Sequence, residues 1–342
     1  MLRSLPAIGF LLLTHILWGQ SILSDGSFYK LGVTKSGLYK IDAAFLSSLG
    51  LDGNAVDPKK ISFYGHNGGM LPQSNAEFAY TDPPENALID FTDNAQGFGS
   101  NEYLLFYAQG PDKSTFNAEG EIEYEKNIYS DTAYYFLTIG STNGKRAGLA
   151  QTTEQQGSVI NYFNEFITRE SEEINLIGSG RRWLGDEFSS TQLTRTFNFE
   201  IPGLRDSVHL LTQIVVQSEG KSSFEISLNG QSSGLISFDS IPTGDGTTYT
   251  IRAKEKAHEM TLTGNNLESI ALNMQYNRAN TSLSRAYLDY FIVSYERELA
   301  LYGNSTAFSH VKAKTGRYTY QIDLNGIDNA TILDITDPVD PK

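Results

Sequence analysis

The densest group of side chains that could do chemistry consists of Arg181, Arg182, Trp183, Asp186 and Glu187. A pair of carboxylates can act as acid and base on a glycosidic bond. Adjacent residues of a β-strand point to opposite faces, however, so Asp186 and Glu187 would not face one substrate. We therefore interpret this cluster as a loop between two domains that is held by internal salt bridges. A hydrolase that uses carboxylates is the least favoured of the functions considered.

The histidines give no pattern typical of a metal site. They are His15, His66, His209, His258 and His310. None of them forms a close metal-ligand pair, and the His-Glu-x-x-His pattern is missing. His66 lies in a glycine-rich loop and is the most site-like of the five, but we interpret it as a turn residue.

A second group of oxygen-bearing side chains could suggest a calcium site. It consists of Asp90, Asp93, Asn94, Asn101 and Glu102. If Asp90 led an EF-hand loop, Ala95 would occupy the invariant glycine position and Asn101 the position of the bidentate glutamate. We therefore predict a carboxylate-lined turn that caps a hairpin, with calcium binding as an alternative.

The sequence also lacks the common nucleophile and phosphate motifs. It contains no cysteine, which excludes disulfides, thiolate metal sites and a cysteine nucleophile within this chain. It has no Gly-x-Ser-x-Gly motif, and its loop at residues 65–69 lacks the Lys-Ser/Thr pair of a phosphate loop. We predict no catalytic, cofactor-binding or metal-binding residue in this chain, and no cofactor.

Length and composition favour two β-rich domains. The 342 residues exceed one ordinary domain, and 31 glycines with 19 tyrosines and 19 phenylalanines favour strands and tight turns. The net charge of −14 repels phosphate backbones, so nucleic acid is not expected as a partner.

The N-terminus has the pattern of a secretory signal peptide. Arg3 precedes a mostly apolar run at residues 7–17, and we place the cleavage after Gly19. No other run is long enough to cross a bilayer, so no transmembrane span is predicted. The expected location is outside the cytoplasm, in the periplasm or at the cell surface, with any association to the outer membrane made through a partner or lipid.

The first domain is expected at residues 20–150 and is built around the buried strand within residues 101–111. A hairpin is predicted from residues 28–33 and 37–42. A short helix is predicted to follow at residues 43–49, with Asp42 as its N-cap and Gly50 at its end. Further strands are predicted at these residues: 61–64, 87–91, 103–108 and 133–139.

A polar segment at residues 141–158 marks the expected domain boundary. The second domain, residues 159–300, carries short strands at regular spacing, which indicates a jelly-roll-like β-sandwich. Its strands are predicted at these residues: 194–201, 208–218, 223–228, 235–238, 247–253, 259–263, 269–276 and 286–295. Residues 301–342 are expected to form a β-stub, with strands at 318–324 and 330–335. The predicted class is all-β, with one short helix near the N-terminus.

Six stretches, taken in order, resemble the N-terminal region of one enzyme family. They are FYKLGVTKSGLYKID at residues 28–42, FYGHNGGMLP at 63–72, YLLFYAQGP at 103–111, RWLGDEF at 182–188, LDYF at 288–291 with EREL at 296–299, and DITDP at 334–338. The family is that of the PorU-like sortases of the type IX secretion system, which are gingipain-family cysteine peptidases.

The resemblance implies a β-region that precedes a catalytic domain with a His and Cys pair. It also implies that the full-length enzyme would cleave C-terminal sorting domains from secreted cargo and help to attach cargo to the cell surface. This chain lacks cysteine and ends where the catalytic domain would begin, so no catalytic residue is transferred from the family to it.

Two functions from different classes follow. The first is a non-catalytic N-terminal portion of such a sortase. Its expected partners, met through the full-length protein, are outer-membrane secretion proteins and cargo sorting domains. The alternative is a secreted carbohydrate-binding or adhesin-like β-sandwich, suggested by the fold and the abundance of tyrosine.

Overall fold

The computed structural model describes residues 21–342, apart from a few short internal segments. The segments outside the description are residues 67, 75, 78–81, 94–95, 118–119, 151–156, 179–180, 243–250, 265–266 and 315. The predicted signal peptide and His15 also lie outside the described residues. Strands account for 47% of the residues and helices for 5%, so the all-β class is confirmed.

The chain passes several times between two compact units. Unit 1 contains the described residues up to Gln109, together with Thr132–Gly148 and Ile335–Lys342. Unit 2 contains Gly110–Asp131 and Leu149–Asp334. The domain boundaries expected from the sequence stay predictions.

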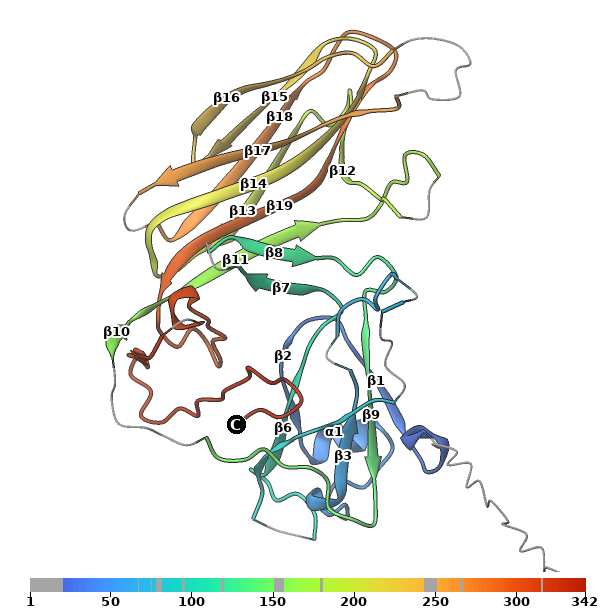
Figure 1. Ribbon diagram of the computed structural model, residues 1–342, viewed down its shortest axis with the longest axis vertical. Coiled ribbons are helices and arrows are strands. Elements are labelled where there is room, and N and C mark those ends of the chain that lie inside the picture. The colour runs from blue at the N-terminus through green and yellow to red at the C-terminus, as the bar shows by residue number, and fades with distance from the viewer. Residues whose placement is uncertain are drawn as a thin grey trace, which may run out of the picture. The chain divides into compact units, whose positions relative to one another are not determined.

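Unit 1 contains two antiparallel sheets that share one core (Figure 1). The first has the order β1-β9-β3-β4, with β1 at Tyr29–Val33, β9 at Ala133–Ile139, β3 at Ile61–Tyr64 and β4 at Glu85–Asn86. The second has the order β2-β6-β5, with β2 at Gly37–Ile41, β6 at Tyr103–Ala108 and β5 at Ile89–Phe91. In β6 the side chains of Leu104, Phe106 and Ala108 are fully buried, while the alternate residues are half-buried.

The expected hairpin at residues 28–42 is wrong in its pairing, although both strands exist. β1 pairs with β9 and β2 pairs with β6, so the two strands belong to different sheets. The turn at residues 34–36 therefore carries the chain from one sheet to the other. Alternation of apolar residues predicts a strand but not its partner, because pairing depends on residues far away in the sequence.

The short helix α1, Ala43–Ser48, is confirmed with its N-cap. The Asp42 carboxylate accepts a hydrogen bond from the backbone N–H of Phe45 at 2.9 Å. Gly50 follows with a φ of +82°, a conformation that glycine adopts without strain. Leu46 is fully buried and fixes the helix against the unit 1 core.

The end of the chain returns to unit 1. The carbonyl of Val339 accepts a hydrogen bond from the N–H of Ala87 at 2.9 Å, directly after β4. The Asp340 carboxylate lies 3.2 Å from Nζ of Lys145, and Pro341 is buried. The last residues thus contact the segment that follows β4.

Unit 2 is built on a two-sheet sandwich of eight strands, coloured from yellow-green to red-orange in Figure 1. One sheet has the order β12-β19-β14-β17, with β12 at Gly185–Phe188, β19 at Ser284–Glu298, β14 at Leu204–Ser218 and β17 at Lys254–Thr263. The other has the order β13-β18-β15-β16, with β13 at Thr194–Glu200, β18 at Ser269–Asn277, β15 at Ser222–Leu228 and β16 at Gln231–Phe238. Apart from the hairpin of β15 and β16, successive strands alternate between the two sheets, and the predicted sandwich is confirmed.

The sandwich core lies between these sheets and is rich in aromatic residues. Phe224 stacks on Tyr276, with ring centroids 5.0 Å apart, and meets Phe188 edge to face at 5.0 Å. β15 and β16 are joined at Asn229 and Gly230, both with positive φ, as the sequence predicts for a tight turn.

Among the described residues, unit 2 has five further strands, and one of them, β11, belongs to the same sheet as β19. β11, Tyr162–Glu170, pairs with the part of β19 that follows the β12 contact. β7, Lys113–Phe116, and β8, Ile122–Glu125, form a hairpin. β10, Ser158–Ile160, pairs in parallel with β20, Tyr318–Tyr320. The 3-10 turns are η1 at Ile22–Ser24, η2 at Pro58–Lys60 and η3 at Val311–Lys314.

Some strand bounds expected from the sequence differ from the structure. Residues 330–335 form no strand. Residues 251–253 form none either, and the rest of the strand expected at 247–253 lies outside the described residues. β17 begins five residues earlier than predicted. Its first residues, Lys254, Glu255 and Lys256, are charged, as is common in a strand at the edge of a sheet, and they lack the apolar alternation from which a strand is predicted. Within the described ranges, no helix has the length and apolar character to span a membrane.

Candidate functional site

The charged cluster predicted as a loop includes the edge strand β12. Asp186 is the extra residue of a β-bulge there, since Gly185 pairs with Leu288 and Glu187 with Tyr287. Its φ of +34° is unusual for a residue other than glycine. The bulge turns the Asp186 side chain inward, and it is 5% exposed.

Two arginines hold the Asp186 carboxylate. Arg169 of β11 donates two hydrogen bonds to it, at 2.6 and 3.0 Å, and Arg195 of β13 lies 3.3 Å away. Because β11 and β13 belong to different sheets, Asp186 joins both sheets of the sandwich at their edge. Both oxygens of this buried carboxylate bind arginines, so its role is to hold the two sheets together.

Asp289 occupies a comparable position on β19. The pairing between β14 and β19 skips this residue, since Gln213 pairs with Tyr290 and Ile214 with Leu288. Arg182 donates to the Asp289 carboxylate at 2.8 Å and also contacts Glu255 of β17 at 2.6 Å. Burial raises the pKa of Asp289, and the bond from Arg182 opposes this shift.

Glu187 and Trp183 are two further members of the predicted cluster. Glu187 lies 3.3 Å from Arg285, so Asp186 and Glu187 bind different arginines, as expected for neighbours on a strand. Trp183 is 39% exposed. The predicted internal salt bridges are present, but Asp186 and Glu187 lie in a strand of the sandwich, which contradicts the interpretation as a loop.

The structure adds a group of carboxylates that the sequence analysis missed. Glu170, the last residue of β11, has its pKa raised to about 7 by burial, by Glu172 and by Asp289. The pKa of Glu172 is also raised, first by burial. The acidic run at residues 170–173 was a signal in the sequence for this group. Strand alternation alone, however, does not show which of these glutamate side chains is buried in the folded protein.

The histidines that the structure describes are dispersed. His66 follows β3 in unit 1, where burial lowers its pKa. On β14, His209 is exposed and contacts Thr261 at 3.0 Å, whereas His258 lies on β17. His310 is buried, and its Nδ1 accepts from the N–H of Lys312 at 3.1 Å. Within the described part of the chain, no group of three or more histidine, aspartate or glutamate side chains could hold a metal ion.

The acidic residues at 90–102 serve as internal acceptors. Asp90 binds the N–H and the hydroxyl of Thr92, and Glu102 accepts from the N–H groups of Asp93 and Gly99. These contacts agree with the predicted carboxylate-lined turn. Asn94 lies outside the described residues, so the alternative of calcium stays untested.

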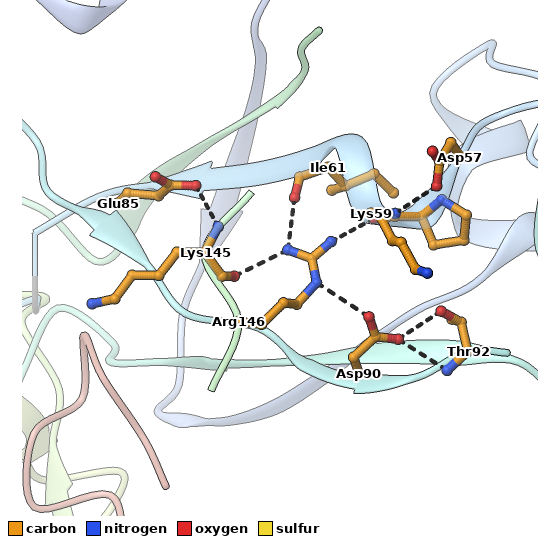
Figure 2. A network of polar contacts seen from close by, with 9 residues as sticks. Asp57, Lys59, Ile61, Glu85, Asp90, Thr92, Lys145 and Arg146 are labelled. Atoms are coloured by element: carbon orange, nitrogen blue, oxygen red, sulfur yellow. Dashed lines mark hydrogen bonds and ion pairs between the residues drawn. The ribbon is translucent and has the colours of Figure 1, made fainter. Parts of the chain in front are cut away.

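Asp90 also belongs to a network centred on Arg146 (Figure 2). The Arg146 guanidinium donates to Asp90 at 3.3 Å and to the backbone carbonyls of Ile61, Lys145 and Pro58. It therefore ties η2, β3 and β5 to the segment after β9. The network fills the donors of a planar guanidinium and leaves little capacity for a ligand.

Comparisons with known proteins place the fold. No protein-family model and no curated protein matches the sequence. The crystal structure of dimeric latent PorU from Porphyromonas gingivalis matches with a TM-score of 0.68 and 22% identity, over 85% of this chain and 26% of that chain. The two proteins therefore share a fold, and this chain spans about a quarter of the length of PorU.

Other solved structures match much less well. The carbohydrate-binding module CBM36 in complex with calcium and xylotriose has a TM-score of 0.23 and 8% identity, over 37% of this chain and 97% of that chain. The insecticidal delta-endotoxin Cry8Ea1 from Bacillus thuringiensis has a TM-score of 0.26 and 11% identity, over 71% of this chain and 43% of that chain. Neither score supports an argument about function.

Proposed function

We propose that this chain is a non-catalytic β-region of a PorU-like sortase of the type IX secretion system. Its role is to support a cysteine peptidase domain and to dock on secretion partners of the outer membrane. The observation that carries the proposal is the fold shared with PorU across 85% of the chain. Export through a signal peptide and a location at the periplasm or cell surface belong to the same proposal.

The placement of the family-like stretches supports a scaffold role. Residues 182–188 and 288–291 are far apart in the sequence, yet Arg182 of the first binds Asp289 of the second. Asp186 of the first also joins the two sheets of the sandwich through its arginines. Asp42 caps α1, and Asp337 accepts from the N–H of Val339 in the final turn. The matching residues thus stabilise the fold, which is the pattern expected for a supporting region.

The chemistry of the chain agrees with this role. Acyl transfer by a cysteine peptidase needs a thiolate activated by a base, and these 342 residues contain no cysteine. A thiolate would have to come from residues outside the sequence given. The buried carboxylates Asp186 and Asp289 are bound to arginines and are not free to act as nucleophiles.

The proposal is tested with a cargo protein that carries a C-terminal sorting domain. We compare this chain alone, a separate peptidase domain with its His and Cys pair, and both joined in one polypeptide. We expect no cleavage by the chain alone and faster cleavage by the joined protein than by the separate domain. Cleavage by the chain alone, or identical rates with and without it, would contradict the proposal.

The alternative, a glycan-binding sandwich, rests on one observation. Trp183 is 39% exposed beside Arg181 and Arg182, and an exposed indole can stack on a sugar ring. If this alternative holds, Trp183→Ala removes binding on a glycan array, whereas the matched variant Tyr129→Ala, at an exposed tyrosine of the segment after β8, keeps it. Absence of any glycan signal for the unaltered chain would exclude the alternative.

A further inference from the structure

Residues 308–314, which come after β19 in unit 2, are bound to the start of β11. Asn164 of β11 makes two hydrogen bonds to this segment. Its N–H donates to the carbonyl of Ser309 at 3.0 Å, and its side-chain oxygen accepts from the N–H of Val311 at 3.2 Å. The backbone is therefore fixed to β11 immediately before and immediately after His310.

His310 is the buried centre of this contact. It is 4% exposed, and its ring meets the ring of Tyr162 of β11 edge to face, with centroids 4.5 Å apart. Nδ1 accepts a hydrogen bond from the backbone N–H of Lys312 at 3.1 Å. A backbone N–H can only donate, so Nδ1 carries no hydrogen. The bound imidazole is therefore neutral, with its hydrogen on Nε2.

The surroundings of the imidazole offer no partner for a positive charge. Among the residues that the structure describes, Nε2 has no hydrogen-bond partner. The Tyr162 hydroxyl accepts from the Lys312 ammonium at 3.2 Å, and the Arg205 guanidinium lies 4.5 Å from the centroid of the Tyr162 ring. Glu296 lies 4.0 Å from Arg205, and Tyr318 is close to Lys312. Of these groups, Lys312 acts on the charge of the imidazole, and it is a cation.

Protonation of His310 is incompatible with this arrangement. The added hydrogen on Nδ1 faces the N–H of Lys312, so two donors meet and the hydrogen bond is lost. A positive charge is also placed in a buried site that supplies no anion. Because Ser309 and Val311 are bonded to Asn164 on either side of the ring, the charged ring reaches water when the segment leaves β11.

We propose that residues 308–314 are bound to β11 through a contact that opens in mild acid, in which neutral His310 holds the segment in place and protonated His310 releases it. This goes beyond the proposed scaffold role, because it names a condition under which one segment of the scaffold detaches from the sandwich.

The direction follows from proton linkage. In the detached segment His310 is in water and has the ordinary pKa of about 6.5, whereas in the bound segment burial, followed by Lys312, lowers its pKa. Binding of the segment is strongest above about pH 6.5, where His310 is neutral in both states. It weakens as the pH falls below about 6.5 and levels off below the lowered pKa. One such group changes the binding equilibrium by at most about tenfold between about pH 7.5 and about pH 5.5.

The test is hydrogen exchange of the full chain, followed on peptides that cover residues 308–314 and the start of β11 and normalised to the intrinsic exchange rate. Protection is expected to be about threefold to tenfold lower at about pH 5.5 than at about pH 7.5. In His310→Asn, whose side-chain oxygen can accept from the same N–H but does not titrate, protection should not depend on pH. The matched control His209→Asn removes an exposed histidine of β14 and should keep the pH dependence.

A second measurement uses the unaltered chain and so does not depend on the folding of a variant. Nitrogen NMR of the isotope-labelled histidine rings should show the hydrogen of His310 on Nε2 at about pH 7.5 and a titration midpoint below about 6.5. The proposal is overturned by a hydrogen on Nδ1, by equal protection at the two pH values, or by a pH dependence that persists in His310→Asn or disappears in His209→Asn. Far-ultraviolet circular dichroism checks that each variant is folded.

Discussion

Asp186 and Asp289 occupy the extra positions of two β-bulges on the paired strands β12 and β19, and arginines hold both carboxylates. Asp289 also marks the place where β19 changes partner, since β11 pairs up to Tyr290 and β12 starts at Leu288. Bulges redirect side chains, and here they direct two aspartates toward arginines from other segments of the sandwich.

Replacing Asp186 by Asn should destabilise unit 2 by about 2 kcal/mol, because Arg169 and Arg195 lose their shared anion at a buried site. Asparagine tolerates the positive φ of this position, so the backbone is preserved. Urea unfolding measures the loss. The control Glu187→Gln breaks only the ion pair with the exposed Arg285 and should cost less than about 1 kcal/mol. Equal losses of unfolding free energy in both variants would refute the stabilising role of Asp186.

Arg146→Lys should destabilise unit 1 by about 2 kcal/mol although the charge is kept. A lysine cannot reach Asp90 and the carbonyls of Ile61 and Pro58 together, because it lacks the planar fork of donors. Differential scanning calorimetry should show a lower Tm for the transition of unit 1. The neighbouring variant Lys145→Ala loses only a half-exposed ion pair with Asp340 and should stay close to the unaltered protein.

Removal of residues 335–342 should weaken unit 1 by about 1–2 kcal/mol. The N–H of Ala87 loses its acceptor at Val339, and Lys145 loses Asp340. Hydrogen exchange should rise at β4 and around Ala87. The matched variant Asp340→Asn keeps the backbone bond and should give a smaller effect. An unchanged exchange rate at Ala87 after truncation would rule out the role of the tail.

Asp42→Ala should cost about 1 kcal/mol at neutral pH through loss of the α1 cap. The N–H of Phe45, followed by Lys40, lowers the pKa of Asp42 below its usual 3.8. The charged cap therefore contributes fully above about pH 4, and its contribution disappears as the pH falls through the lowered pKa. The difference between the two proteins should shrink in acid unfolding experiments. In Asp42→Asn the remaining cap should not vary with pH over this range.

Much of the local structure could be predicted. Strand alternation located β6, β9 and the strands of the sandwich, because each of them buries one face in a core. The helix α1 was found through its cap and the glycine after it, and the turn at Asn229 and Gly230 through its residue types. These signals lie within a few residues and need no information about the rest of the chain.

The pairing of the strands and the fate of the charged residues could not be predicted. β1 and β2 are separated by three residues but join different sheets, since their partners β9 and β6 come much later. The bulge at Asp186 cannot be seen from its neighbours, because it arises from the register against β19. Glu170 resembles the glutamates beside it, and only burial and its surroundings set it apart.

The sequence alone determined the all-β class, the sandwich, the absence of a thiol nucleophile and the resemblance to sortase N-terminal regions. The tertiary structure alone decided which arginine binds which acid, and it made Glu170 the carboxylate with a pKa near 7. The physical reason is the range of the interactions. Periodicity and capping act between residues a few positions apart, whereas burial and charge pairing depend on segments that meet only after the chain has folded.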